Sequence, residues 1–329
     1  MAGPLELVCP AGTPAALKAA VDAGADVVYL GFRDETNARN FPGLNFSREE
    51  LRDGIDYAHH QGVQIFVAIN TYPAAGAPEP WWRAVDDAAR LGADAVIVAD
   101  IGLADYARTR HPDLRLHLSV QASAASAAAI EMFRQEFGIR RVVLPRVLTL
   151  EEIAALNRAI GVETEVFVFG GLCVMAEGRC ALSCYATGRS PNTHGCCSPA
   201  DSVHYEDRGD RLVSRLGEFV INTFAPDEPA GYPTLCKGRF VANGRASYLF
   251  EDPVSLNAIR LLPELAQAGV TGLKIEGRQR GRAYIARVVG AFRQAVDALA
   301  RGEPVPPIDL GAVTEGGRDT AGAYRKSWH

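Results

Sequence analysis

The chain has 329 residues, of which 48% are hydrophobic, so it is long enough to bury a large core. Its formal net charge of −5 and the lack of a Lys/Arg-rich run argue against the broad basic surface that nucleic-acid binding needs, and we expect no nucleic-acid partner. The N-terminus has no charged region followed by an apolar one, and no run of about 18 apolar residues could span a membrane. We therefore expect a cytoplasmic protein without a transmembrane segment.

Short β-branched runs alternate with amphipathic helical patterns along the chain. The runs that predict strands are 5–10, 26–32, 63–70, 93–100, 115–121, 141–146, 164–169 and 271–276. Several helical patterns between them end in steps such as Ala23-Gly24 and Leu91-Gly92, where glycine can take the left-handed conformation that ends a helix. Eight strands joined by helices predict an α/β fold, a (β/α)8 TIM-like barrel.

The series is interrupted after the seventh strand. The first seven strands begin about 20–40 residues apart, but the eighth begins far later, at Thr271, and residues 173–250 hold six of the seven cysteines. We divide the chain into barrel strands one to seven (1–172), a cysteine-rich cluster-binding insertion (173–250), the barrel closure (251–303) and a C-terminal tail (304–329). Within the closure, residues 255–265 are predicted to form the delayed seventh helix.

Polar residues stand where the predicted strands end. Barrel active sites are built at these ends, from the loops that follow the strands, so the insertion would lie over the same mouth. Each residue alone could be a loop cap or a solvated charge, but together they predict a substrate site. Its candidates are Arg39, Asn70, Gln121, Arg146, Lys274 and Arg278, with Glu276 as a candidate acid/base that an ion pair would explain almost as well.

Four cysteines in the insertion have the spacing Cys173-x6-Cys180-x16-Cys197-x38-Cys236. Four thiolates suit either a structural zinc or an iron–sulfur cluster. Zinc ribbons favour Cys-x2-Cys pairs, and none is present among these four, so wide spacing favours a cluster over zinc. Cys9 lies on the first predicted strand, where a cysteine usually serves as a small buried hydrophobe.

The segment from Glu165 to Ser183 resembles the signature of the U32 peptidase family, the collagenase-like proteases, although Gly171 stands where serine or alanine is usual. Further matching segments cover nearly the whole chain. They are 8–12, 36–39, 43–46, 119–123, 142–148, 190–193, 197–200, 231–239 and 274–280. The likeness is greatest to the branch of the family that takes part in oxygen-independent ubiquinone biosynthesis.

This resemblance implies a 4Fe-4S cluster on Cys173, Cys180, Cys197 and Cys236, with Cys184 and Cys196 outside the ligand set. It also implies hydroxylation of the aromatic ring of a prenylated quinone precursor without dioxygen, with prephenate as the oxygen donor. The working form would be a heterodimer with a UbiV-like sister protein, and other ubiquinone-biosynthesis proteins would deliver the lipid. From charge and position, we expect Arg39, Arg146, Lys274 and Arg278 to meet the carboxylates of prephenate.

Other interpretations remain open. A peptidase is disfavoured, because His59-His60 is followed by Gln61-Gly62 rather than by a His-Glu-x-x-His pattern, and no Gly-x-Ser-x-Gly elbow is present. Other branches of the family modify RNA, which is an alternative substrate. The chain could also be a non-catalytic electron-transfer or scaffold subunit, or the cluster could simply clamp a long loop.

Overall fold

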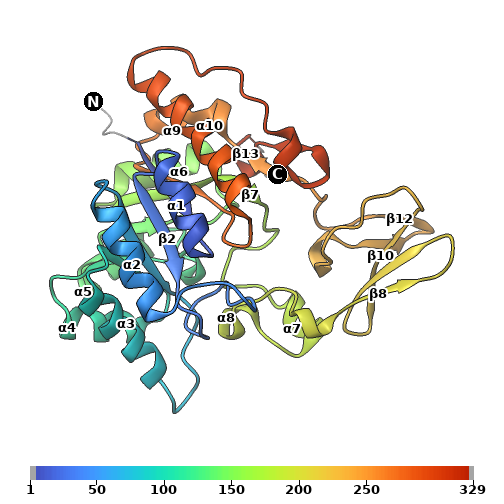
Figure 1. Cartoon of the computed structure of the whole chain (residues 1–329), viewed down its shortest axis with the longest axis horizontal. Helices are drawn as coiled ribbons and strands as arrows, with labels where there is room; N and C mark the ends of the chain where they lie inside the picture. The colour runs from blue at the N-terminus through green and yellow to red at the C-terminus, as the bar shows by residue number, and fades with distance from the viewer. Residues whose placement is uncertain (1–4, 326–329) are drawn as a thin grey trace.

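The computed structural model describes residues 5–325 and contains a closed parallel barrel. Its eight strands are β1 (Glu6–Pro10), β2 (Val27–Gly31), β3 (Gln64–Ile69), β4 (Ala95–Val98), β5 (Arg115–Leu118), β6 (Arg141–Val143), β7 (Glu163–Gly171) and β14 (Gly272–Ile275). Each pairs with the next in parallel, and β14 closes the ring between β7 and β1. The barrel predicted from the alternating pattern is confirmed, and its eight predicted strands are all present (Figure 1).

Helices cover the outside of the barrel. They are α1 (Pro14–Asp22), α2 (Arg48–His59), α3 (Glu79–Leu91), α4 (Ile101–Arg110), α5 (Ala127–Phe137), α6 (Leu150–Ala159), α9 (Leu262–Gln267) and α10 (Arg282–Ala300). Ser47 and Thr149 begin α2 and α6 with capping boxes, and Asp100 accepts from the backbone N–H of Leu103 to begin α4. None of the helices in residues 5–325 is both long enough and apolar enough to cross a membrane.

The predicted helix over 255–265 is wrong in its first half. Ser255–Asn257 forms strand β13, which runs antiparallel to the end of β7 and parallel to β15 (Asp319–Thr320). A 3-10 turn at Ile259–Leu261 follows, and α9 begins only at Leu262, with Pro263 in its first turn. The residues at 255–257 extend because the exposed edge of β7 beyond the barrel offers backbone partners, which a helical periodicity in the sequence does not reveal.

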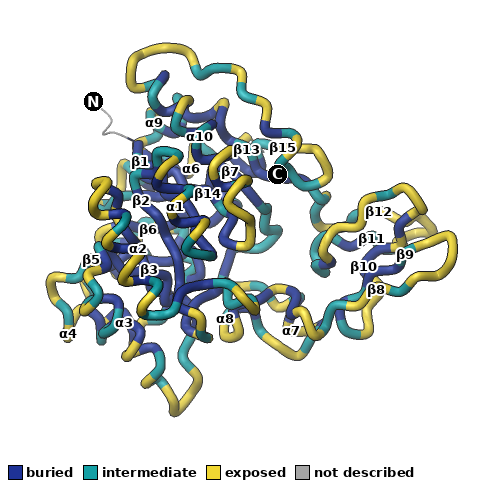
Figure 2. Tube along the Cα trace, viewed as in Figure 1, coloured by how far each residue is buried: buried dark blue, intermediate teal, exposed yellow. Residues whose placement is uncertain are grey.

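The segment between β7 and β13 forms a separate lobe, drawn in yellow and gold in Figure 1. It contains two short helices, α7 (Leu182–Thr187) and α8 (Pro191–His194), a three-stranded antiparallel sheet of β8 (Val203–Asp207), β9 (Leu212–Leu216) and β10 (Phe219–Phe224), and a hairpin of β11 (Arg239–Ala242) and β12 (Arg245–Tyr248). Its own apolar core is small, formed by Ala186, Leu216 and Ile221. Much of the lobe is therefore exposed (Figure 2).

The C-terminal segment returns to the barrel. Its 3-10 turns are Gly311–Val313, Glu315–Gly317 and Gly322–Arg325, and β15 pairs with β13. The Tyr324 hydroxyl donates to the carbonyl oxygen of Phe167 on β7 at 2.5 Å, and Glu315 forms an ion pair with Lys237 of the insertion. The segment thus joins the insertion to the strand from which it departs.

The barrel interior is divided by chemistry. Strands β1 to β4 contribute an apolar cluster that consists of Val8, Val27, Tyr29, Phe66, Ala68, Ala95 and Ile97. The other four strands contribute ionisable side chains, namely His117, Arg141, Glu165 and Lys274, all buried. Because buried charges are costly unless paired, this half of the barrel has to be held by an ion-pair network, and that network leads to the mouth.

Candidate functional site

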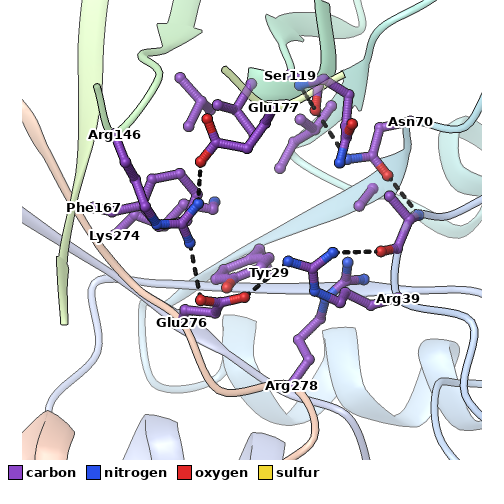
Figure 3. Close-up of a pocket in the computed structure, with 16 residues that line it drawn as sticks. Tyr29, Arg39, Asn70, Ser119, Arg146, Phe167, Glu177, Lys274, Glu276 and Arg278 are labelled. Carbon is purple, nitrogen blue, oxygen red and sulfur yellow. Dashed lines mark hydrogen bonds and ion pairs between the residues drawn. The ribbon is translucent and has the colours of Figure 1, made fainter. Parts of the chain in front are cut away.

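A cavity of about 50 Å³ lies at the C-terminal ends of the strands. Its lining includes all seven residues predicted from strand ends, which are Arg39, Asn70, Gln121, Arg146, Lys274, Glu276 and Arg278 (Figure 3). They come from the loops after β2, β3, β5, β6 and β14 and from β14 itself. The barrel therefore gathers these side chains around one small space, although it gives them different partners.

Asn70 has a positioning role in this arrangement. Its amide oxygen accepts from the backbone N–H of Ala38 at 2.9 Å, and its amide nitrogen donates to the Ser119 hydroxyl at 2.9 Å. The two contacts hold the loops after β2 and β5 in place. Gln121, by contrast, has a buried side-chain oxygen without a partner among the described residues.

Glu276 bridges two arginines. Its carboxylate accepts from Arg39 at 2.8 Å and from Arg146 at 2.9 Å (Figure 3). Burial alone would raise the pKa of Glu276, but the charges of Arg146 and Arg39 outweigh it and lower the pKa to about 2. A carboxylate held in this way is a weak base at neutral pH, so the geometry favours the ion-pair role over acid–base chemistry.

Arg146 is surrounded by partners. It forms a second ion pair with Glu177, and its guanidinium lies over the Phe167 ring at 3.4 Å from the ring centre. Its Nε atom and one Glu177 oxygen are nevertheless buried without hydrogen bonds among residues 5–325. Arg146 is thus already paired with two carboxylates of the protein, Glu177 and Glu276. These pairs leave it less free to bind a substrate carboxylate than its position at the end of a strand suggested.

Lys274 belongs to the network inside the barrel. Its ammonium donates to Glu165 at 2.6 Å and lies 3.5 Å from the centre of the Tyr29 ring. Glu165 also faces Arg141 at 3.4 Å, and Arg141 is shared with Glu6 and Glu163. Burial lowers the pKa of Lys274, and Glu165 partly offsets that effect. Lys274 is therefore a neutralised cation at the floor of the cavity.

Arg278 differs from the other three cations. Its only side-chain hydrogen bond within residues 5–325 is to the amide oxygen of Asn37, at 3.2 Å, and no carboxylate in that range pairs with it. Burial lowers the pKa of Arg278 to about 10. The charge of Arg39 adds to this effect, and Tyr29 and Glu276 partly oppose it. The residue is 6% exposed.

The four predicted cluster cysteines lie along the insertion side of the mouth. Burial raises the pKa of Cys197 to about 11, the charge of Arg39 opposes this, and charge on Cys180 and Cys236 adds to it. Burial also raises the pKa of Cys173 to about 12, the charges of Glu177 and Cys197 add to this, and the charge of Arg146 opposes it. Cys197 is thus close enough to the other three thiols to influence or be influenced by them, and Arg39 and Arg146, which pair with Glu276, act on Cys197 and Cys173.

The donor set is compatible with a cluster. Cys197 lies within electrostatic reach of Cys180 and Cys236, and Cys173 lies within reach of Cys197. Four thiolates are the ligands of a 4Fe-4S cluster, which Cys173, Cys180, Cys197 and Cys236 would hold. Cys184 is exposed on α7, Cys196 is buried beside Cys197, and Cys9 is buried in β1 as expected of a small hydrophobe.

Nine residues of the cavity lining were not predicted from the sequence, among them Glu177, Tyr29 and Phe167. Glu177 stands between Cys173 and Cys180 in the sequence. Its charge, in a segment of small and apolar residues, was the feature that could have indicated a place in the cavity. Tyr29 interrupts an apolar strand with a phenol, whose hydroxyl donates to the Ile275 carbonyl at 2.9 Å. Phe167 gave no signal, because an aromatic residue in a buried strand is ordinary.

Comparisons with known proteins place these features in a family context. The sequence pattern of peptidase family U32 matches residues 12–315. The chain is 35% identical over 318 residues to the tRNA hydroxylation protein P of Escherichia coli (strain K12), a match that covers 91% of this chain and 69% of the relative. It is 31% identical over 298 residues to the tRNA hydroxylation protein P1 of Bacillus subtilis (strain 168), covering 89% and 63%.

A third relative acts on ribosomal RNA. The 23S rRNA 5-hydroxycytidine C2501 synthase of Escherichia coli (strain K12) is 31% identical over 301 residues, and the match covers 90% of this chain and 40% of the relative. The chain thus spans less than two thirds of two of these three relatives. The names of the three relatives share hydroxylation and differ in the RNA that is modified.

Proposed function

The chain belongs to peptidase family U32, and from that membership and the geometry of the mouth we propose that it is the iron–sulfur subunit of an oxygen-independent hydroxylase. Its substrate would be the ring of a prenylated phenol in ubiquinone biosynthesis, with prephenate as oxygen donor. This is the role that the resemblance of the segments named above to the ubiquinone-biosynthesis branch of the family implies. Hydroxylation is supported at a coarser level by the names of the relatives.

The observation that carries the proposal is the position of the four cysteines over a cavity with an excess of positive charge. Arg39 lies close enough to Cys197, and Arg146 close enough to Cys173, for their charges to act on those thiols. The same two arginines hold Glu276 in the cavity. A redox group on the cysteines and an anionic donor in the cavity would therefore be neighbours.

The proposed reaction balances without dioxygen. A ring C–H bond becomes C–OH while a C–OH bond of the donor becomes C–H, so the ring is oxidised by two electrons and the donor is reduced by two. A cluster with four thiolate ligands supplies one-electron redox chemistry when bound. The chain's own residues would bind and orient the donor.

A peptidase activity has no support in the site. The pattern of the zinc peptidases and the nucleophile elbow are both missing from the sequence, and the cavity is lined by ion pairs rather than by a nucleophile with a base. The name of the family therefore does not describe the proposed activity.

The proposal includes a partner, a UbiV-like sister protein. Eleven large hydrophobic residues are exposed in residues 5–325, and eight of them lie in the insertion between residues 185 and 250. They are Tyr185, Tyr205, Phe219, Val220, Tyr232, Val241, Leu249 and Phe250. A gathering of exposed apolar side chains on one lobe supports a binding surface there, which a protein partner would cover.

Hydroxylation of an RNA base is the second candidate, because the relatives named above act on RNA. The insertion, residues 173–250, contains eight Lys and Arg and eight Asp and Glu, so the lobe beside the mouth has no excess of positive charge. RNA binding needs such an excess to neutralise phosphates. We therefore favour the small phenolic substrate.

The test is a reconstitution under anaerobic conditions. The cluster-loaded protein, with its UbiV-like partner and prephenate, is offered a prenylated phenol in one reaction and transfer RNA or ribosomal RNA in another, and the products are analysed by mass spectrometry. We expect the phenol to gain one oxygen atom and the RNA to remain unchanged. Hydroxylated RNA would support the second candidate, and a protein with stoichiometric zinc and no iron would refute the cluster.

A further inference from the structure

Arg278 is a buried cation without a counter-ion, which is unusual in a protein interior. The other three cations of the cavity each have at least one carboxylate. Arg39 pairs with Glu276, Arg146 with Glu276 and Glu177, and Lys274 with Glu165. Arg278 has none among residues 5–325 and is 6% exposed. An unpaired buried charge destabilises a fold, so its presence at a functional mouth calls for a ligand.

The charges around the cavity leave one positive charge over. Four cations stand against the three carboxylates of Glu165, Glu177 and Glu276, and Glu165 is also shared with Arg141. The carboxylates of Glu177 and Glu276 line the cavity itself. A group with one negative charge, such as one carboxylate, would neutralise this surplus, whereas a doubly charged group such as phosphate would meet repulsion from both glutamates.

One further donor in the lining is free to receive such a ligand. Nε of Arg146 lines the cavity and is buried without a hydrogen bond in the described chain. Tyr29 and Asn37 hold the guanidinium from behind, with Tyr29 at 5.6 Å from it and the Asn37 oxygen at 3.2 Å. The guanidinium is therefore fixed before any ligand arrives, which reduces the entropic cost of binding.

The size of the cavity limits what can enter. About 50 Å³ is room for a few waters or for one small planar group. We propose that the cavity is a carboxylate site in which Arg278 binds a single carboxylate group of a small organic acid and leaves the rest of the acid toward the cysteines. Arg39 and Arg146 remain occupied by Glu276 while it does so.

This inference deepens the proposed function, because one carboxylate of prephenate is the natural occupant. It also corrects the expectation that four cations share the donor. Arg278 is the binding residue, and Arg39, Arg146 and Lys274 are neutralised by the protein's own glutamates.

The experiment is calorimetric titration of the anaerobic, cluster-loaded protein with prephenate, and separately with acetate as the smallest probe. We compare Arg278→Met, Arg278→Lys and, as a matched control, Arg280→Gln. Arg280 is also an arginine of the loop after β14, but it is exposed and does not line the cavity. We expect prephenate to bind at least tenfold more weakly to Arg278→Met, to an intermediate degree to Arg278→Lys, and unchanged to Arg280→Gln.

Thermal melting separates a binding role from a structural one. Arg278→Met removes no ion pair within residues 5–325 and relieves an unpaired buried charge, so its melting temperature should equal or exceed that of the parent. Equal prephenate binding by Arg278→Met and the parent would overturn the inference, as would a parent that binds neither prephenate nor acetate. Tighter binding of inorganic phosphate than of acetate would overturn the assignment to a single carboxylate.

The outcomes also distinguish the inference from the proposed function. If prephenate binds through Arg278 but the reconstituted complex hydroxylates no phenol, the carboxylate site stands and the proposed reaction fails. If Arg278→Met hydroxylates the phenol at the parent rate with unchanged dependence on prephenate concentration, the reaction stands and the site fails.

Discussion

Replacing Glu276 by glutamine tests whether this carboxylate is an ion-pair partner or an acid/base. The side chain is 18% exposed and accepts from Arg39 and Arg146. Their charges lower the pKa of Glu276 from its ordinary 4.5 to about 2, and a shift of that size corresponds to roughly 3 kcal/mol of folding free energy at neutral pH. Glu276→Gln should therefore destabilise the protein by about that amount at pH 7.

The expected change in melting temperature follows from the size of the chain. For 329 residues, the entropy of unfolding makes each kcal/mol worth roughly 1.4 °C, so Glu276→Gln should melt about 4 °C below the parent. Because the folded pKa is lowered, the stabilisation is complete above pH 4.5 and is lost as the pH falls toward 2. The difference between variant and parent should shrink over that interval.

The assay is thermal unfolding followed by circular dichroism, with iron content measured in parallel. A matched control is Glu206→Gln, because Glu206 also pairs with two arginines, Arg208 and Arg215, but is exposed on β8. This surface ion-pair network should contribute little to the free energy of unfolding, so Glu206→Gln should melt close to the parent. A Glu276→Gln variant that melts within 1 °C or so of the parent but loses hydroxylation with an altered pH profile would refute the ion-pair interpretation and support the acid–base one.

Three further predictions concern the cluster, its electrostatics and the loop that carries Arg278. Alanine at Cys173, Cys180, Cys197 or Cys236 should remove at least half of about four irons per chain after anaerobic preparation, whereas Cys184→Ala and Cys196→Ala should keep the iron. The reverse result would show that the four ligands were assigned wrongly. Arg39→Gln should lower the reduction potential of the cluster by on the order of 60 mV, because a positive charge near Cys197 favours the reduced state. The measurement is a redox titration followed by electron paramagnetic resonance, and an unchanged or raised potential would contradict the prediction. Gly12→Ala would place a Cβ atom 1.8 Å from the Arg278 carbonyl oxygen and should weaken prephenate binding by displacing that loop. The control Gly290→Ala on α10, where a Cβ meets nothing within 4 Å, should bind prephenate like the parent. Equal binding by both variants would show that the position of the loop does not affect prephenate binding.

The sequence alone determined the barrel fold and several of the residues that lie at the C-terminal ends of its strands. Strands buried on both faces appear as apolar runs, so all eight could be located, and the rule that active sites form at the C-terminal ends of barrel strands then brought Arg39, Gln121 and Arg278 together. These are properties of local pattern and topology, and they require no knowledge of side-chain contacts.

Only the tertiary structure decided which cations are neutralised. In the sequence, Arg146 and Arg278 are equivalent arginines after barrel strands, yet Arg146 meets Glu177 and Glu276 while Arg278 meets an uncharged amide. Glu177 lies in the insertion, and no helix or strand periodicity in the sequence predicts that it lines the cavity. The strand at Ser255–Asn257 likewise depends on the free edge of β7. Ion pairs and edge strands are settled by separations of a few ångströms between segments far apart in the chain, because electrostatic and hydrogen-bond energies change steeply over that range.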